Sequence, residues 1–200
     1  MPSSISRFAV GSRRRLTCAL LAGACGVTCA TASRAQSGVG EDLDVPYVTT
    51  PQNVVDAMLE LAGIGPSDIL LDLGSGDGRV VITAAQRFGT RGTGIELDPR
   101  LIALARAGAN AAGVGARATF LEQDLFATDL ASASVITLYL LPAVNLKLRA
   151  ALQGLKPGTR IVSHDWDMGD WPADKSVVVA APEKKVGLTK SSKLMLWIIK

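Results

Sequence analysis

A glycine-rich turn flanked by two acidic residues is the stretch of this chain best suited to chemistry. Residues 69–79 read I-L-L-D-L-G-S-G-D-G-R, so Gly74, Gly76 and Gly78 follow a short apolar run. Glycine tolerates a positive φ in a tight turn, and without a Cβ it lets a ligand lie against the backbone. Because Asp72 and Asp77 flank the turn, it favours a cationic amino group over a pyrophosphate, which the carboxylates would repel.

The elements around the turn indicate a strand, a glycine loop and a helix. The apolar run 69–73 is typical of a buried strand, and apolar residues at 81, 84, 85 and 88 share one helical face. The spacing G-x-G-x-G differs from the G-x-G-x-x-G of dinucleotide sites. S-adenosylmethionine carries the ammonium group that such a loop would attract. An ordinary strand-to-helix turn without a ligand is the alternative at this point.

A second acidic residue lies where a nucleoside could use it. Residues 93–95 form a short strand that ends at Glu96, about one helix and one turn beyond Gly78. A carboxylate at the end of the second strand of a βαβ unit can accept both ribose hydroxyls of a nucleoside. A solvated acid at a strand end is the alternative for an isolated glutamate.

Taken together, these stretches resemble a known family. L-D-L-G-S-G-D-G-R followed by G-I-E-L-D-P is similar to the first two motifs of the class I, Rossmann-like, S-adenosyl-L-methionine-dependent methyltransferases. The resemblance implies an α/β, doubly wound, mostly parallel sheet of seven strands in the order 3-2-1-4-5-7-6, the last antiparallel. It also implies that the methyl donor is held by Asp72, Gly74, Ser75, Gly76, Asp77, Gly78, Glu96, Leu97, Asp98, Asp124 and Leu125.

Further stretches resemble one subgroup of these enzymes. P-Y-V-x-T-P at 46–51 and Y-L-L-P at 139–142 are similar to the ATP synthase c-subunit lysine methyltransferase family and its bacterial relatives. The resemblance implies a protein lysine as methyl acceptor. Tyr139, at the end of the strand 134–140, is the candidate for orienting that acceptor. Thr50 and Pro142 are candidate substrate contacts, and so is Tyr47, unless it only packs on the following helix.

The remaining pattern predicts further helices and strands. Thr50 as N-cap and Pro51 as first residue predict a helix to Ala62. Other helices are expected from Pro99 to Gly113 and from Asn145 to Leu155, and strands at 118–121, 134–140, 159–163, 177–180 and 194–199. The loop 164–172 holds two tryptophans and three aspartates, which suit a neutral or cationic partner. Trp166 is therefore a candidate substrate contact, and packing over a sheet edge is the alternative.

The first 35 residues have the character of a targeting segment. They hold five arginines and no acid, and residues 16–33 are an uncharged run that precedes Arg34 and Ala35. This pattern predicts a signal peptide or a membrane anchor, a linker at 36–44 and a methyltransferase domain at 45–200. Export to a bacterial periplasm or anchoring in the inner membrane follows. An anchor with the domain on the cytosolic side is the alternative that keeps access to the methyl donor.

The composition also limits the kinds of partner and site that we expect for this chain. Without the five leader arginines, 16 basic and 18 acidic residues remain, a net charge of −2, so we expect no nucleic-acid partner. All three cysteines lie in the leader and His164 is the only histidine, so we expect no metal site and no cysteine nucleophile. The open alternatives are a small-molecule or rRNA methyltransferase with the same donor site, and a non-catalytic exported binding protein of this fold.

Overall fold

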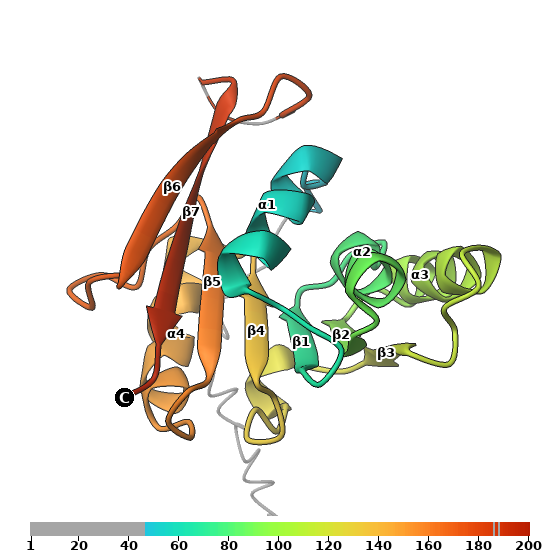
Figure 1. Cartoon of the computed structure of the whole chain (residues 1–200), viewed down its shortest axis with the longest axis horizontal. Coiled ribbons are helices and arrows are strands. Elements are labelled where there is room, and N and C mark those ends of the chain that lie inside the picture. The colour runs from blue at the N-terminus through green and yellow to red at the C-terminus, as the bar shows by residue number, and fades with distance from the viewer. Residues whose placement is uncertain (1–46, 186, 188) are drawn as a thin grey trace, which may run out of the picture. The chain divides into compact units, whose positions relative to one another are not determined.

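A computed structural model describes residues 47–185, 187 and 189–200 of the chain. The leader, the expected linker and the first two residues of the expected domain lie outside the described residues. One sheet of seven strands organises the domain, in the order β3-β2-β1-β4-β5-β7-β6 (Figure 1). The strands are β1 (Ile69–Leu73), β2 (Arg91–Glu96), β3 (Ala118–Glu122), β4 (Val135–Leu138), β5 (Arg160–His164), β6 (Lys175–Ala180) and β7 (Ser191–Ile198).

The strand directions match the expected fold. The first five strands are parallel to one another, and β7 runs antiparallel to both β5 and β6. The expected seven-stranded α/β methyltransferase fold is therefore confirmed, including its strand order. The central strands β1, β4 and β5 are buried along almost their whole length because helices cover both of their faces.

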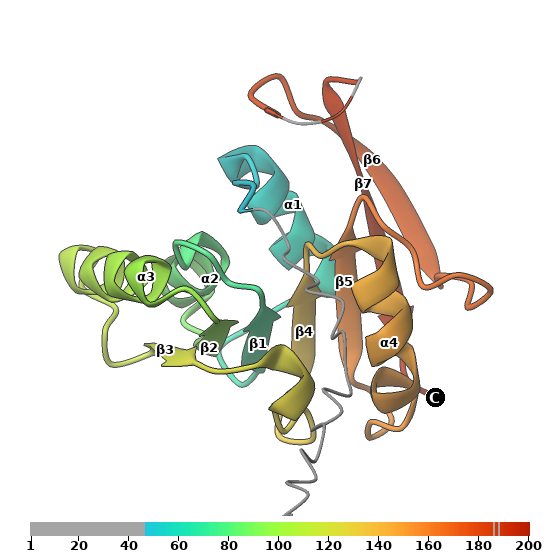
Figure 2. The same ribbon diagram turned by 180° about the vertical axis from the view of Figure 1, so that it is seen from behind.

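The helices divide between the two faces of the sheet. Helices α1 (Gln52–Ala62), α2 (Arg79–Phe88) and α3 (Pro99–Ala111) pack on one face, and α4 (Pro142–Gln153) on the other (Figures 1 and 2). A single 3-10 turn, η1 (Leu125–Ala127), follows β3. Alternate residues of β1 serve the two cores: Leu70 faces α1 and α2, whereas Leu71 and Leu73 face α4. Within the described residues, no helix is long and apolar enough to span a bilayer.

Two helices begin at residues other than those expected. The N-cap of α1 is Pro51, not Thr50, and no side chain caps this helix. The hydroxyl of Thr50 instead lies 3.3 Å from the Nδ1 atom of His164, a contact between distant parts of the chain. Helix α4 begins at Pro142 rather than Asn145, because proline is well suited to the first helical position and holds Leu141 in an extended conformation.

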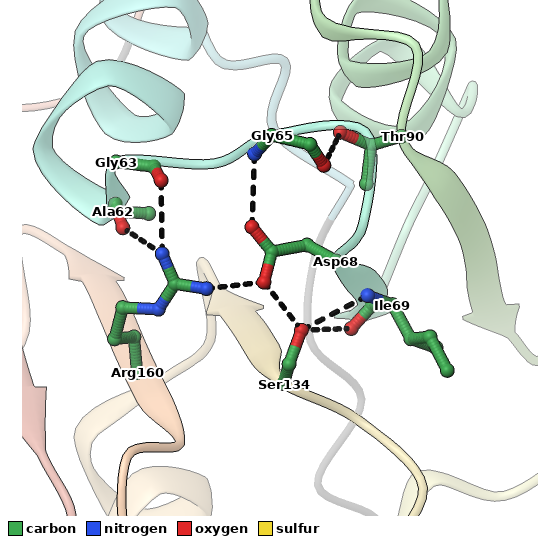
Figure 3. A network of polar contacts seen from close by, with 8 residues as sticks. All are labelled: Ala62, Gly63, Gly65, Asp68, Ile69, Thr90, Ser134 and Arg160. Atoms are coloured by element: carbon green, nitrogen blue, oxygen red, sulfur yellow. Dashed lines mark hydrogen bonds and ion pairs between the residues drawn. The ribbon is translucent and has the colours of Figure 1, made fainter.

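A polar network joins the amino-terminal ends of three parallel strands (Figure 3). Asp68, just before β1, accepts hydrogen bonds from the hydroxyl of Ser134 (2.7 Å) and the backbone N–H of Gly65 (2.8 Å), and pairs with Arg160. The guanidinium of Arg160 also donates to two carbonyl oxygens at the end of α1, at 2.7 and 2.9 Å. The network thus fixes the starts of β1, β4 and β5 to one another and to α1.

We predict that Asp68→Ala lowers the free energy of unfolding by roughly 1–3 kcal/mol, because it leaves partly buried donors without their acceptor. Urea denaturation measures this loss. Asp170→Ala is the matched control, since Asp170 forms an ion pair with Arg149 but its side chain is 88% exposed. The Asp170→Ala control should lower the free energy of unfolding by at most about 0.5 kcal/mol. Equal losses in the two variants would show that the network does not stabilise the sheet.

Candidate active site

A cavity of about 650 Å³ opens at the carboxyl-terminal edge of the sheet, at the opposite ends of the strands from the polar network. It is lined by residues that follow β1, β2, β3 and β4, together with residues 47–50. The strand order reverses between β1 and β4, and open α/β sheets bind ligands at such a point. Most of the predicted site residues line it: Tyr47, Thr50, Asp72, Gly74, Ser75, Gly76, Asp77, Glu96, Leu97, Asp98, Asp124, Leu125 and Tyr139.

Asp72 is a buried carboxylate on the wall of this cavity. It lies in β1 beside Thr137 of β4, whose hydroxyl donates to Asp72 Oδ1 at 2.6 Å. The pKa of Asp72 is raised to about 7, chiefly by burial; the hydroxyl of Thr137 opposes the rise, and the neighbouring carboxylates of Asp77 and Glu96 add to it. A cation placed in the cavity would relieve this cost by favouring the charged form.

Glu96 connects the end of β2 to the glycine loop. Its Oε2 accepts from the backbone N–H of Gly76 at 3.0 Å, and its Oε1 accepts from Leu97 and Asp98 at 2.8 and 3.0 Å. A carboxylate has about four lone-pair directions, so these three bonds leave room for a further donor. The bonds also hold the side chain in one orientation, which suits recognition of a sugar.

Asp77 does not act as a free charge. The guanidinium of Arg79 pairs with it, with Nε 2.9 Å from Oδ1, and this ion pair holds the pKa of Asp77 below its ordinary value. The same guanidinium donates to the carbonyl oxygen of Thr50 at 2.7 Å, which ties residues 47–51 to the start of α2. Of the two acids expected to attract a cation, Asp72 is therefore the one that lacks a cationic partner among the described residues. Sequence reasoning gave Arg79 no role, although its position two residues after Asp77 is a usable signal.

Tyr47 lies directly over the glycine loop. A Cβ on Gly76 would lie 2.6 Å from the Tyr47 ring, and the φ of Gly76 is +53°. Only glycine allows both the positive φ and the close approach of the ring without strain, so the Tyr47 ring packs directly on the loop. Tyr47 is 48% exposed and lines the cavity, which places it between the site and solvent.

Three predicted site residues do not line the cavity. Gly78 packs against the protein interior, since a Cβ there would lie 2.5 Å from Phe120 and 2.8 Å from Ala105. Pro142 is the exposed first residue of α4. Trp166 is 43% exposed beyond the end of β5. The aromatic packing considered for the loop 164–172 belongs instead to Trp171, whose ring lies 5.8 Å from that of Trp197.

Two further acids shape the outer part of the cavity. The side chain of Asp98 caps α3 by accepting from Arg100 N at 2.8 Å, and it pairs with the guanidinium of the same arginine. Asp124 caps η1 by accepting from Phe126 N at 2.8 Å. Among the apolar lining residues, Leu97 and Phe126 are 64% and 48% exposed. Apolar side chains next to acids that cap helices suit a flat heterocycle with polar edges.

Tyr139 follows the last residue of β4 and lines the inner part of the cavity. Burial, and then the charge of Asp165, raises the pKa of Tyr139 to about 12, so the hydroxyl is protonated at neutral pH. Its ring stacks on the imidazole of His164, with the ring centroids 3.8 Å apart. Sequence reasoning used His164 only to exclude a metal cluster and missed this contact.

Comparison with known proteins agrees with this geometry. The model of the ANTKMT methyltransferase domain family matches residues 72–175. A protein-lysine N-methyltransferase of Saccharolobus islandicus is 43% identical over 129 residues, which cover 64% of this chain and 80% of that protein. The adenine nucleotide translocase lysine N-methyltransferase of mouse is 36% identical over 130 residues, 64% of this chain and 56% of that protein.

A solved structure is similar as well. An RNA methyltransferase from Salinibacter ruber, in complex with S-adenosyl-L-homocysteine, is 49% identical, with a TM-score of 0.68. The match covers 76% of this chain and 94% of that one. Animal proteins named as lysine N-methyltransferases of the ATP synthase c-subunit are also relatives, which confirms the resemblance found in the sequence. The chain spans about half the length of the animal relatives it matches.

The family match covers just over half of the chain and includes most of the cavity, from the end of β1 to the residues after β4. The seven-stranded sheet and the carboxyl-edge cavity are those expected of a class I methyltransferase. This chain belongs to the ANTKMT methyltransferase domain family and is an S-adenosyl-L-methionine-dependent methyltransferase.

Proposed function

We propose that this chain transfers a methyl group from S-adenosylmethionine to a lysine side chain of a protein. The observation that carries the proposal is the 43% identity to the protein-lysine N-methyltransferase of Saccharolobus islandicus. The charge of the cavity supports a cationic acceptor. Five carboxylates line it, and its two arginines both pair with aspartates.

The residues that line the cavity fit the methyl donor. S-adenosylmethionine, when bound, supplies an electrophilic methyl group on a sulfonium. Asp72 would hold its ammonium, Glu96 its ribose hydroxyls, and Asp124 with Leu125 its adenine. The volume of about 650 Å³ is within the range of small-molecule sites. Ser75 adds a buried hydroxyl that has no hydrogen-bond partner among the described residues.

The protein itself need supply no nucleophile for this reaction. It must align the acceptor with the methyl group, and such positioning can contribute roughly 7–11 kcal/mol to lowering the barrier. A lysine amine has an ordinary pKa near 10.4 and attacks only when neutral, and removal from water lowers that pKa. Tyr139, which is half-buried, lines the cavity and is protonated at neutral pH, would orient the acceptor in this proposal.

A second candidate acceptor is RNA. The similarity to the Salinibacter ruber protein, described as an RNA methyltransferase, favours it. The carboxylates that line the cavity oppose it, because phosphate groups bind where lysine and arginine are free to neutralise them. The net charge of −2 for residues 36–200 points the same way. We therefore place protein lysine first.

We predict that Asp72→Asn stabilises the donor-free protein. With a raised pKa, the stability that Asp72 contributes is complete below about pH 3.8 and is lost as pH rises through about 7. The neutral amide removes this cost. Urea denaturation at pH 8 should give a free energy of unfolding about 2–4 kcal/mol above that of the wild type. The difference should shrink towards pH 5, and an unchanged difference would contradict the assignment.

The same variant should bind the donor roughly tenfold or more weakly by calorimetry, because a charge-assisted hydrogen bond to the ammonium is lost. In the wild type, affinity should rise between pH 5.5 and 7.5 as Asp72 ionises. Thr137→Val is the companion variant, since it removes the hydroxyl that stabilises the carboxylate. It should move this rise in affinity to higher pH. Wild-type binding by Asp72→Asn would exclude the ammonium from this position.

We predict that the purified full-length chain transfers label from methyl-tritiated S-adenosylmethionine to protein in a cell extract. Acid hydrolysis should yield labelled methyllysine. The label should be sensitive to protease and resistant to ribonuclease. Glu96→Ala, which removes the carboxylate at the end of β2, should reduce incorporation at least tenfold because it weakens the donor site. Label that ribonuclease releases would establish the second candidate instead.

We propose further that residues 16–33 act as an uncleaved anchor that keeps the domain on the cytosolic side of a membrane. The support is the uncharged run in the sequence and the need for a cytosolic methyl donor. The intact mass of the protein recovered from membranes should include the leader. A mature chain that begins at residue 36 would instead show cleavage and export.

A further inference from the structure

Behind the wall of the cavity lies the imidazole of His164, the only histidine of the chain. It is the last residue of β5 and is completely buried. The ring stacks on Tyr139, with centroids 3.8 Å apart and planes 27° apart, and its Nδ1 lies 3.3 Å from Thr50 Oγ1. Both contacted residues line the cavity, whereas His164 does not. One buried ring therefore supports two residues of the inner cavity wall.

The surroundings of the ring decide which nitrogen carries the proton. Burial lowers the pKa of His164, and Lys184 opposes the effect of Asp165, so the imidazole is neutral at pH 7. Its Nε2 lies 2.7 Å from Ser192 Oγ and 3.5 Å from Asp165 Oδ2. Lys184 holds the Asp165 carboxylate at 2.7 Å, and an ionised carboxylate only accepts hydrogen bonds. The Nε2–H tautomer suits these neighbours, because its N–H faces the carboxylate, and it leaves the lone pair on Nδ1.

This tautomer determines what the Thr50 hydroxyl can do. In the Nε2–H tautomer the hydroxyl hydrogen of Thr50 is directed to Nδ1 of His164, so its remaining capacity is as an acceptor. The backbone of Thr50 is fixed as well, because its carbonyl oxygen accepts from Arg79 at 2.7 Å. Thr50 is only 6% exposed, and it lines the cavity. With its hydrogen engaged by His164, Thr50 Oγ1 can offer only lone pairs to another group.

We propose that His164 is a positioning residue that fixes Thr50 Oγ1 as the hydrogen-bond acceptor for the nitrogen that receives the methyl group, and holds the Tyr139 ring beside it. The inference rests on the proposed methyl transfer to an amine and states how that amine is recognised. A neutral primary amine has two N–H bonds and one lone pair. Donation of one N–H to Thr50 leaves the lone pair available for the methyl group.

The tautomer can be measured without any acceptor. Long-range ¹H–¹⁵N spectra of the ¹⁵N-labelled full-length chain, purified with a histidine-free tag, contain the imidazole signals of a single residue. We expect the neutral Nε2–H form between pH 6 and pH 8. Thr50→Val should shift the Nδ1 resonance and leave Nε2 almost unchanged. A proton on Nδ1, or an imidazolium at pH 7, would overturn the proposal.

Two substitutions at His164 then separate positioning from packing. The amide of His164→Asn reaches the place of Nδ1, and that of His164→Gln the place of Nε2, while both lose the ring that stacks on Tyr139. Calorimetric donor affinity should stay within about threefold of the wild type for both variants. With cell-extract protein as acceptor, kcat for methyllysine formation should fall roughly 10–100-fold in His164→Gln and Thr50→Val, and clearly less in His164→Asn.

Equal losses of kcat in the Asn and Gln variants would overturn the proposal, because the Nδ1 contact would then have no special role. A loss of donor affinity with an intact circular dichroism spectrum would do the same, since it would place His164 in the donor site. If the wild type forms no methyllysine in the extract, the proposed function fails. The tautomer spectra would still test the arrangement of Thr50 and His164 independently.

Discussion

The burial of one carboxylate at the end of β1 is the constraint around which this domain is arranged. Asp72 is 5% exposed, and its one side-chain partner among the described residues is the hydroxyl of Thr137 on the neighbouring strand. A charge in such a place costs free energy until a cation approaches it. The sheet tolerates this cost because the rest of β1 is apolar and packs on both faces. In the proposed site, the ammonium of the donor would relieve this cost on binding and so would stabilise the fold.

The aspartates at the two ends of the parallel strands differ in how their charge is compensated. At the amino-terminal edge, Asp68 is paired with Arg160 and accepts two further hydrogen bonds, so its charge is fully compensated. At the carboxyl-terminal edge, Asp72 has no cationic partner among the described residues, although Arg79 lies two residues beyond Asp77 and pairs with it instead. An aspartate thus stabilises the amino-terminal edge, where it is paired, whereas the aspartate at the carboxyl-terminal edge keeps its charge available for a ligand.

Sequence reasoning succeeded where the relevant contacts are local. The glycine loop and Glu96 were found from stretches of a few residues whose spacing carries the signal, and the strand order was expected from the family resemblance of those stretches. It was wrong about Thr50, because a threonine before a proline has the local pattern of an N-cap, whereas its hydroxyl contacts a residue 114 positions away. The charge of Asp77 was assigned without its partner Arg79, although this pairing is local and could have been predicted from the spacing. Pairings of side chains across the sheet leave no periodic trace in the chain.

The residues proposed to bind the donor and those proposed to meet the acceptor also differ in how far apart they lie in the sequence. The residues proposed to hold the donor all lie between residues 72 and 126 and therefore fall within the family match. The wall proposed to meet the acceptor includes Thr50 and Tyr139, with the imidazole of His164 behind them and Ser192 beyond the imidazole. Thr50 and Ser192 lie outside the matched residues 72–175. The family match therefore covers all the residues proposed to hold the donor but only part of the wall proposed to meet the acceptor, so the family resemblance supports the donor more fully than the choice of acceptor.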